Sequence, residues 1–283
     1  MKSSNPFSIP ILYTHLQEFC KFFIVKKESG EKLNIKGNTE EESRLIRETQ
    51  KALGVKEDGI IGNATFADLV GRLCPEILPA TLEMYGVPVI VGRDIIPFSP
   101  GGALSGYANT ISGTFTYPRA TTPCSIQFHE NTGALCTSAC HAWLDYPESV
   151  LYRTQSGEMG IKRVKSLREI KPSLRWAIGG VGLLGNYNPK AEGFCKMEQG
   201  GKTYDYSDVL RKTNHTVLGI KGNLVYGILF KNKTAAEING YCRDKFQFDL
   251  AIMLDGGTDI SAFNGAGIKQ NANRKQGSAV QFI

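Results

Sequence analysis

The 283-residue chain lacks a long hydrophobic run, and this absence excludes a helical membrane-spanning protein. No apolar stretch reaches the roughly 18 residues that a bilayer-crossing helix needs. The N-terminal segment MKSSNPFSIPILYTH has one lysine, and its short apolar portion is interrupted by Pro10, so it is a poor secretory signal. We therefore expect synthesis in the cytoplasm without a signal peptide, and no membrane partner.

The chain also lacks a regular cysteine framework and a dense block of basic residues. Its seven cysteines are odd in number and irregularly spaced, which argues against a full set of disulfides and favours a reducing compartment. Without a dense Lys/Arg block, no nucleic-acid partner is expected. Residues 1–77 carry 11 basic and 11 acidic side chains, so the net charge of +6 belongs to residues 78–283. Such a basic part suits an anionic partner, for example a phosphate-bearing glycan.

Hydrophobic periodicity divides the chain into a helical N-terminal unit, residues 1–77, and a β-rich part, residues 78–283. Prolines in residues 74–82 predict a linker between them. Short β-rich runs bounded by Gly, Pro and Asn fill the second part. The predicted fold class is α+β, with a small three-helix domain followed by a domain with a large mixed sheet and little helix. The expected helices are residues 11–26, 39–54, 63–73 and 235–245.

A turn pattern lies within residues 48–70, ETQKALGVKEDGIIGNATFADLV. Asp58 and Gly59 are expected to form a turn, and Thr65 suits the start of the next helix. The pattern resembles the bacterial peptidoglycan-binding module, in which Q-x-x-L precedes D-G-x-x-G-x-x-T. This resemblance implies a unit that tethers a catalytic domain to the cell wall, with Gln50, Asp58, Gly59 and Thr65 as wall-binding residues. The alternative is a helical unit that keeps these turns without binding sugar.

Residues 251–263, AIMLDGGTDISAF, begin as a strand and continue with two acids around a pair of glycines. The run AIML predicts a strand buried on both faces. Asp255 follows at its carboxyl end, and Gly256 and Gly257 allow a sharp turn and close approach of a ligand to the main chain. The alternative is a tight turn in which Asp255 caps its own backbone.

Four segments in a fixed order resemble the phosphodiester glycosidase family, which includes the lysosomal enzyme that uncovers mannose 6-phosphate. They are ANTISGTFTYP at 108–118, WAIGGVGLLGN at 176–186, NHTVLGIKGNLVYGILFKNKTAAEINGYC at 214–242 and DLAIMLDGGTDISAF at 249–263. The family has an early N-G-[GT]-[FY]-F loop, a G-G strand, an R-T-A-x-G strand, a helix and L-D-G-G-G-S. The resemblance covers about residues 78–283 and implies hydrolysis of a sugar whose anomeric oxygen is bonded to phosphorus.

The resemblance also implies roles for individual residues. Asp255 and Asp259 are the candidates for acid/base chemistry, since glycosidic cleavage uses carboxyl groups. His215, which stands where the family has Arg, is expected to carry a positive charge beside the phosphate, because a nearby anion raises the pKa of an imidazole. The expected substrate-binding residues are Ser112, Gly113, Thr114, Gly180, Gly256, Gly257 and Thr258. Ser112 replaces the family's Asn, and Thr258 with Asp259 replaces its final Gly-Ser.

Two other patterns give competing interpretations. GGVGLLG contains a formal G-x-G-x-x-G, but NYNPKAEGF follows it and cannot form the helix that a dinucleotide site needs. The segment 124–141 is rich in Cys and His, although its spacing matches no known zinc finger or ribbon. A Cys–His hydrolase would use Cys140 or Cys136 as nucleophile and His129 or His215 as base. We expect no cofactor and no metal.

Together the two resemblances predict a cell-wall-targeted glycosidase that cleaves a phosphodiester-linked sugar in an envelope glycan. Its partner would be bacterial cell-wall glycan or peptidoglycan. A wall-binding unit without a signal peptide suggests a phage lysin or tail-associated hydrolase that reaches the wall after lysis. The alternatives are a non-catalytic glycan-binding protein and a peptidoglycan hydrolase that acts on glycan or peptide bonds.

Overall fold

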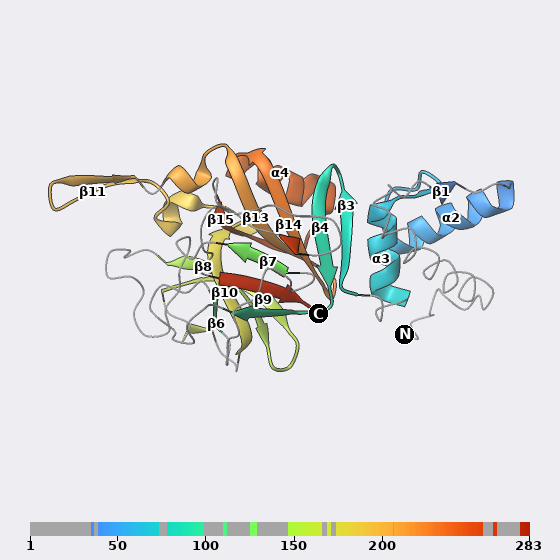
Figure 1. Ribbon diagram of the computed structural model, residues 1–283, viewed down its shortest axis with the longest axis horizontal. Helices are drawn as coiled ribbons and strands as arrows, with labels where there is room; N and C mark the ends of the chain where they lie inside the picture. The colour runs from blue at the N-terminus through green and yellow to red at the C-terminus, as the bar shows by residue number, and fades with distance from the viewer. Residues whose placement is uncertain are drawn as a thin grey trace.

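The protein is built around a large antiparallel sheet, with a smaller sheet on one face and helical turns on the other (Figure 1). The computed structural model describes residues 35–36, 39–73, 78–98, 110–111, 125–128, 147–165, 169–170, 174–205, 207–256, 263–264 and 278–283. Within these residues no helix is long and apolar enough to cross a membrane. The chain is therefore mixed α/β, with β structure predominating.

The N-terminal unit consists of two described helices and one short strand pairing. Helix α2 (Glu40–Leu53) begins directly after Thr39, and α3 (Asn63–Leu73) begins at Asn63, as predicted. The pairing of β1 (Ile35–Lys36) with β2 (Ile60–Ile61) was not predicted. The third expected helix, residues 11–26, lies outside the described residues, so the three-helix domain is not confirmed.

Within the described residues, the large sheet contains nine strands. In spatial order they are β3 (Ala80–Met84), β4 (Val87–Gly92), β14 (Leu224–Lys233), β13 (Thr213–Lys221), β15 (Leu250–Gly256), β10 (Leu174–Gly182), β8 (Glu148–Thr154) and β9 (Met159–Val164), with β6 (Thr110–Ile111) also paired to β10. Every described pairing in it is antiparallel. The prediction of a mixed sheet is therefore wrong. Tight turns join successive strands such as β13 and β14, and a tight turn can only join antiparallel neighbours.

The second sheet covers one face of the large sheet. Its strands are β16 (Phe263–Asn264), β7 (Ser125–Phe128), β17 (Ser278–Phe282) and β5 (Ile95–Phe98), in that order. Ile95, Val280 and Phe282 of this sheet share a hydrophobic cluster with buried residues of the large sheet, among them Trp176 and Leu254. The second sheet covers Ile252 and Leu254, while Ala251 and Met253 belong to the hydrophobic cluster on the opposite face. Residues 251–254 are therefore buried on both faces, as the run AIML predicted.

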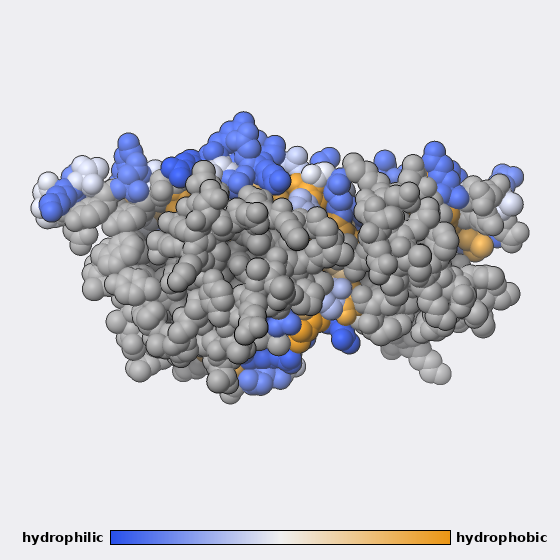
Figure 2. Space-filling model, in the orientation of Figure 1, coloured by the Kyte–Doolittle hydropathy of each residue, from blue (hydrophilic) through white to orange (hydrophobic). Residues whose placement is uncertain are grey.

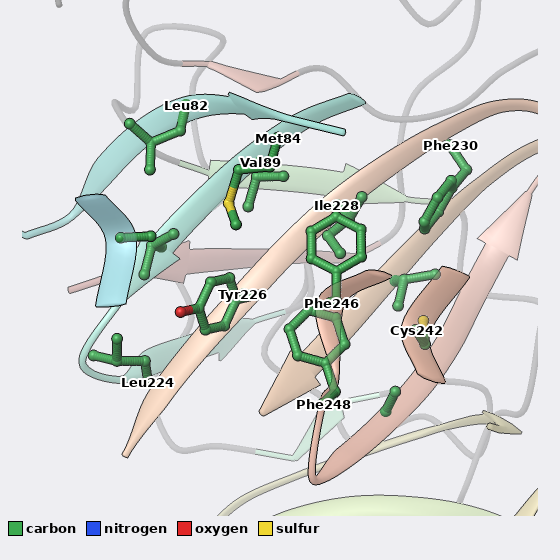
Figure 3. Packing of buried hydrophobic residues seen from close by; sticks show 14 of the residues in the cluster. Leu82, Met84, Val89, Leu224, Tyr226, Ile228, Phe230, Cys242, Phe246 and Phe248 are labelled. Atoms are coloured by element: carbon green, nitrogen blue, oxygen red, sulfur yellow. The ribbon is translucent and has the colours of Figure 1, made fainter. Parts of the chain in front are cut away.

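The opposite face of the large sheet carries α4 (Ala235–Tyr241) and a π-helical turn, Cys242–Phe246. Thr234 caps α4 in a capping box with Glu237, so the predicted start of this helix is confirmed. Phe246 stacks on Phe248 with ring centroids 5.0 Å apart, in a cluster that includes Tyr226 (Figure 3). Full burial of each such ring stabilises the fold by about 1.5–3 kcal/mol.

Helix α3 attaches the N-terminal unit to this face. Phe66 and Leu69 of α3 belong to the same hydrophobic cluster as the sheet residues. Asp68, which is 8% exposed, accepts a hydrogen bond from the Lys221 ammonium at 3.1 Å and one from the Tyr226 hydroxyl at 3.4 Å. The two parts of the chain thus share one hydrophobic cluster, and β3 already begins at Ala80, inside the predicted linker.

A two-stranded hairpin lies at the other end of the molecule from α2 and α3 (Figure 1). It pairs β11 (Lys196–Gln199) with β12 (Lys202–Asp205) through Gly200 and Gly201. Both glycines have positive φ, of 59° and 74°, which a tight hairpin turn requires.

Candidate functional site

The four segments that resemble the glycosidase family supply neighbouring strands of the large sheet. Residues 214–242 contain most of β13 and all of β14, and residues 249–263 contain β15. Residues 176–186 contain most of β10, and residues 108–118 contain β6. The strand order β14–β13–β15–β10, with β6 also on β10, makes these segments adjacent. Segments far apart in sequence therefore converge in one region of the sheet.

A β-bulge lies at the carboxyl end of β15. His215 of β13 pairs with Gly256, and Val217 pairs with Met253, so one residue of β13 faces both Leu254 and Asp255. A bulge bends its strand and re-aims side chains, and bulges are frequent beside active sites. Asp255 thus occupies an irregular strand end rather than a regular ladder position.

The early segment meets β10 on the edge that β15 also uses. Ala177 of β10 pairs with Tyr152 of β8 on one side and with Ile111 of β6 on the other. Val181 of β10 pairs with Met253 of β15. The pairing with β6 reaches Ile178 and the pairing with β15 begins at Val181, three residues or about 10 Å farther along the same edge. The early and late motif segments therefore pair with the same edge of β10.

Several predicted site residues lie outside the described residues. They are Ser112, Gly113, Thr114, Gly257, Thr258 and Asp259. Asp255 and Gly256 are described as part of β15, Gly256 through its pairing with His215. Ser112 directly follows Ile111 of β6, and Gly257 directly follows the end of β15. Their roles stay predictions.

Gly180 is a packing residue. It is buried in β10, where a Cβ atom would lie 2.5 Å from the carbonyl oxygen of Met253 and 3.1 Å from Cγ1 of Ile252. Only glycine allows β10 and β15 this close, so the predicted contact of Gly180 with substrate lacks structural support. The turns after β10 are short 3₁₀ turns, Leu184–Asn186 and Pro189–Glu192, so the expectation that no α-helix follows the glycine motif is confirmed.

The imidazole of His215 is fully buried. Its Nε2 lies 3.0 Å from the carbonyl oxygen of Arg211, and its Nδ1 has no hydrogen-bond partner of normal geometry among the described residues. The pKa of His215 is lowered, and burial is the main cause. Main-chain hydrogen bonds with Arg211 and Lys233 raise this pKa, while the positive charge of Arg211 lowers it further. Burial therefore disfavours the positive charge that was predicted for His215.

A second buried ionisable group, Glu192, was not predicted. Its carboxylate accepts hydrogen bonds from the backbone N–H groups of Ser149 at 3.1 Å and Gly182 at 3.2 Å, and pairs with Arg163 at 3.3 Å. Burial raises the pKa of Glu192, while these partners oppose the rise. Gly182 ends β10, away from the part of that strand that meets β6. Glu192 therefore joins strands and turns outside the candidate site, and its sequence context, N-P-K-A-E, gave no signal.

The residues predicted to bind cell wall hold a turn of the N-terminal unit. Gln50 is fully buried, and its amide nitrogen donates to Asp58 Oδ1 and to the Ile60 carbonyl, both at 2.9 Å. Its amide oxygen accepts from the Gly59 N–H at 2.8 Å. Gly59 has a φ of 72°, and Thr65 is buried in α3. This accounts for the spacing of the motif, and it leaves Gln50 without a group to offer a wall ligand.

The alternatives based on cysteine and histidine involve another part of the chain. Cys124, His129, Cys136, Cys140 and His141 lie outside the described residues. In the part of the chain that the structure describes, no three His, Cys, Asp or Glu side chains gather as a metal site would require. The zinc and Cys–His hydrolase interpretations thus stay hypotheses about an undescribed segment.

Comparison with known proteins gives no sequence match and low structural similarity. No protein-family model and no curated protein sequence matches the chain. The catalytic domain of zebrafish N-acetylglucosamine-1-phosphodiester alpha-N-acetylglucosaminidase, auto-inhibited by its pro-peptide, is similar with a TM-score of 0.46 at 10% identity, over 72% of this chain and 80% of that chain. A hypothetical protein from Synechocystis is similar with a TM-score of 0.34 at 9% identity, over 71% and 60%. A function has to be argued from the chain's own residues.

Proposed function

We propose that residues 78–283 form a glycan hydrolase that cleaves a phosphodiester-linked sugar. The observation that supports this proposal is the bulge that contains Asp255 at the end of β15, where Gly256 pairs with His215. The early motif segment pairs through β6 with β10, the strand next to β15. A carboxylate followed by a glycine bend, at a strand end where motif segments converge, suits a site in which main-chain N–H groups hold phosphate oxygens.

In the proposed reaction, water attacks the anomeric carbon and the bond from that carbon to the phosphate oxygen breaks. The products are a free sugar and a phosphomonoester. Asp255 and Asp259 guide and deprotonate the water, as carboxylates do in glycosidases. Phosphate leaves readily, so the reaction needs less acid assistance than release of an alcohol. His215, buried and neutral, acts as a positioning residue that holds the start of β13 against the bulge.

The decisive experiment replaces the carboxylate by an amide. Asp255→Asn should lower kcat for a nitrophenyl-phosphoryl sugar by about 10²–10⁴-fold, the usual contribution of acid/base catalysis. Asp244→Asn is the matched control, because Asp244 is an exposed carboxylate in the π-helical turn, paired with the adjacent Arg243. Full activity of the Asp255 variant would refute the assignment, whereas an equal loss in both variants would indicate a general effect of the substitution.

A non-catalytic glycan receptor is the second candidate. The observation that favours it is the buried, neutral His215 at a position where the related family has Arg. A receptor would bind the sugar phosphodiester without turnover. Calorimetric binding together with product analysis by mass spectrometry separates the two: binding with no release of phosphomonoester supports the receptor.

We also propose that the N-terminal unit attaches this activity to bacterial cell wall, and that the protein reaches the wall after phage-mediated lysis. The support is the turn motif of residues 50–65. Because Gln50 is buried, the contact would have to come from other residues of the unit. Co-sedimentation of the full chain with purified sacculi tests the attachment, and a chain that stays in the supernatant contradicts it. Mass analysis of soluble fragments would detect cleavage of peptidoglycan itself.

A further inference from the structure

Exposed cationic side chains gather at the end of the sheet that contains the candidate site. Arg211 and Lys212 directly precede β13, and Lys231 lies near the end of β14. Thr213 pairs with Lys233, so these two strand ends lie side by side. Arg211, Lys212 and Lys231 are all exposed, and we name these three residues the cationic rim.

The charges of the cationic rim are not neutralised by ion pairs. None of its three residues forms an ion pair within the described part of the chain, whereas nearby Lys233 pairs with Glu237 at 3.4 Å. Glu237 is already engaged in capping α4 through the N–H and hydroxyl of Thr234. The rim therefore presents three positive charges to solvent.

The cationic rim lies close to the carboxyl end of β15. Gly256, His215 and Phe230 face one another on the adjacent strands β15, β13 and β14. Strands in a sheet are about 4.8 Å apart, so β14 lies roughly 10 Å from β15. Figure 2 shows strongly hydrophilic surface along the edge where Figure 1 draws β13, β14 and α4. This distance is comparable to the screening length of about 8 Å at physiological salt, so an anion at the end of β15 is attracted by the rim.

We propose that the cationic rim binds further phosphates of a polymeric substrate, a glycan with repeating phosphodiester links that continues past the cleaved bond. This inference depends on the proposed function. A single sugar phosphodiester carries one negative charge, and the bend itself would hold that phosphate. Three additional unpaired cations near the end of β15 match a ligand whose negative charges recur along a chain. A neutral glycan would gain nothing from them, and the surplus charge makes the polymer's affinity dependent on salt.

The test uses the full chain and poly(glycerol phosphate) of defined length as the probe. The rim variant combines Arg211→Gln, Lys212→Gln and Lys231→Gln. The control variant combines Lys165→Gln, Lys190→Gln and Lys202→Gln. These three lysines are also exposed and without ion pairs in the described structure, and they lie outside β13, β14 and β15. Both variants lose three positive charges, so they share the same net charge.

Affinity for the polymer should fall about tenfold or more in the rim variant, since each exposed ion pair contributes modestly and three are lost. The slope of log affinity against log salt should become shallower by roughly two units in the same variant, because fewer counterions are released on binding. The control variant should bind like the wild type. An equal decrease in both variants, or no decrease in either, would overturn the proposal.

Two further measurements separate this inference from its premise. If single-stranded DNA binds the wild type as tightly as the polymer and shows the same loss in the rim variant, the rim is a general polyanion surface and the assignment to a glycan is wrong. Turnover of a nitrophenyl-phosphoryl sugar by the wild type tests the hydrolase itself. Absence of that turnover refutes the proposed function, while binding of poly(glycerol phosphate) still decides whether the rim is a polymer-binding surface.

Discussion

Replacing His215 by glutamine should change how the stability of the protein depends on pH. The imidazole is fully buried, its Nε2 faces the carbonyl of Arg211, and its Nδ1 has no described partner. The Nε2–H therefore donates to Arg211, and Nδ1 is the nitrogen that would take up a proton. Protonation there would place a charge in the interior, which is why burial lowers the pKa of His215.

The sign and size of the effect follow from the linkage between protonation and folding. The unfolded imidazole has a pKa near 6.5, and the folded one has a lower pKa. Above about pH 6.5 both states are neutral, and the contribution of His215 to stability is fully present. As the pH falls below that value, the unfolded state takes up a proton and the folded state does not. The free energy of unfolding then decreases by up to about 1.4 kcal/mol per pH unit until the folded pKa is reached.

The measurement is urea unfolding at pH 7.5, 6.5 and 5.5 for the wild type and His215→Gln. Trp176, which is buried in the large sheet and donates to Asp94 at 2.8 Å, contributes to the fluorescence signal. The variant keeps an amide N–H for the Arg211 carbonyl but has no titrating ring. Its stability should therefore fall less steeply between pH 6.5 and 5.5 than that of the wild type. Parallel curves over that interval would show that His215 is not a buried neutral imidazole.

Two further predictions concern packing and the attachment of the N-terminal unit. Gly219→Ala should lower the free energy of unfolding by about 1–3 kcal/mol, because a Cβ there would lie 2.3 Å from Cε2 of Phe248. Gly185→Ala is the control and should be nearly neutral, because nothing lies within 4 Å of a Cβ at that position. Equal urea midpoints for the two variants would contradict this prediction. Asp68→Asn should destabilise the protein by about 1–3 kcal/mol by leaving Lys221 without its partner. A double-mutant cycle with Lys221→Met measures the coupling, and a coupling energy near zero would show that the ion pair does not stabilise the attachment of α3.

Local sequence signals predicted α2, α3, the start of α4 and the buried strand. Thr234 with Glu237 marks the start of α4, and the run AIML marks a strand between two layers. Such features depend on residues three or four apart, which a sequence shows directly. The direction and order of the strands were not predictable in this way. Short apolar runs look alike, and β10 joins β15, β8 and β6 through contacts between residues far apart in the chain.

The bulge at Asp255 shows the same limit at the candidate site. It exists because Leu254 and Asp255 together face one residue of β13, and that relation depends on a register between two strands. No pattern within residues 251–263 reveals it. Glu192 was missed for a related reason, because its partners come from strands β8, β9 and β10. The residues of a motif are therefore visible in the sequence, whereas the strand register around them is not.

The two motif-based predictions differ in what their polar groups contact. The amide of Gln50 is hydrogen-bonded within its own turn, so folding alone is sufficient to explain its spacing from Asp58 and Gly59. Strand β15 ends in a bulge beside the start of β13, and a regular antiparallel ladder would have no need of that irregularity. Internal hydrogen bonds explain the Gln50 motif without a ligand, so the motif is weak support for ligand binding. Regular strand pairing does not explain the bulge in β15, so the bulge is stronger support for a functional role. For that reason the case for function is stronger at Asp255 than in the N-terminal unit.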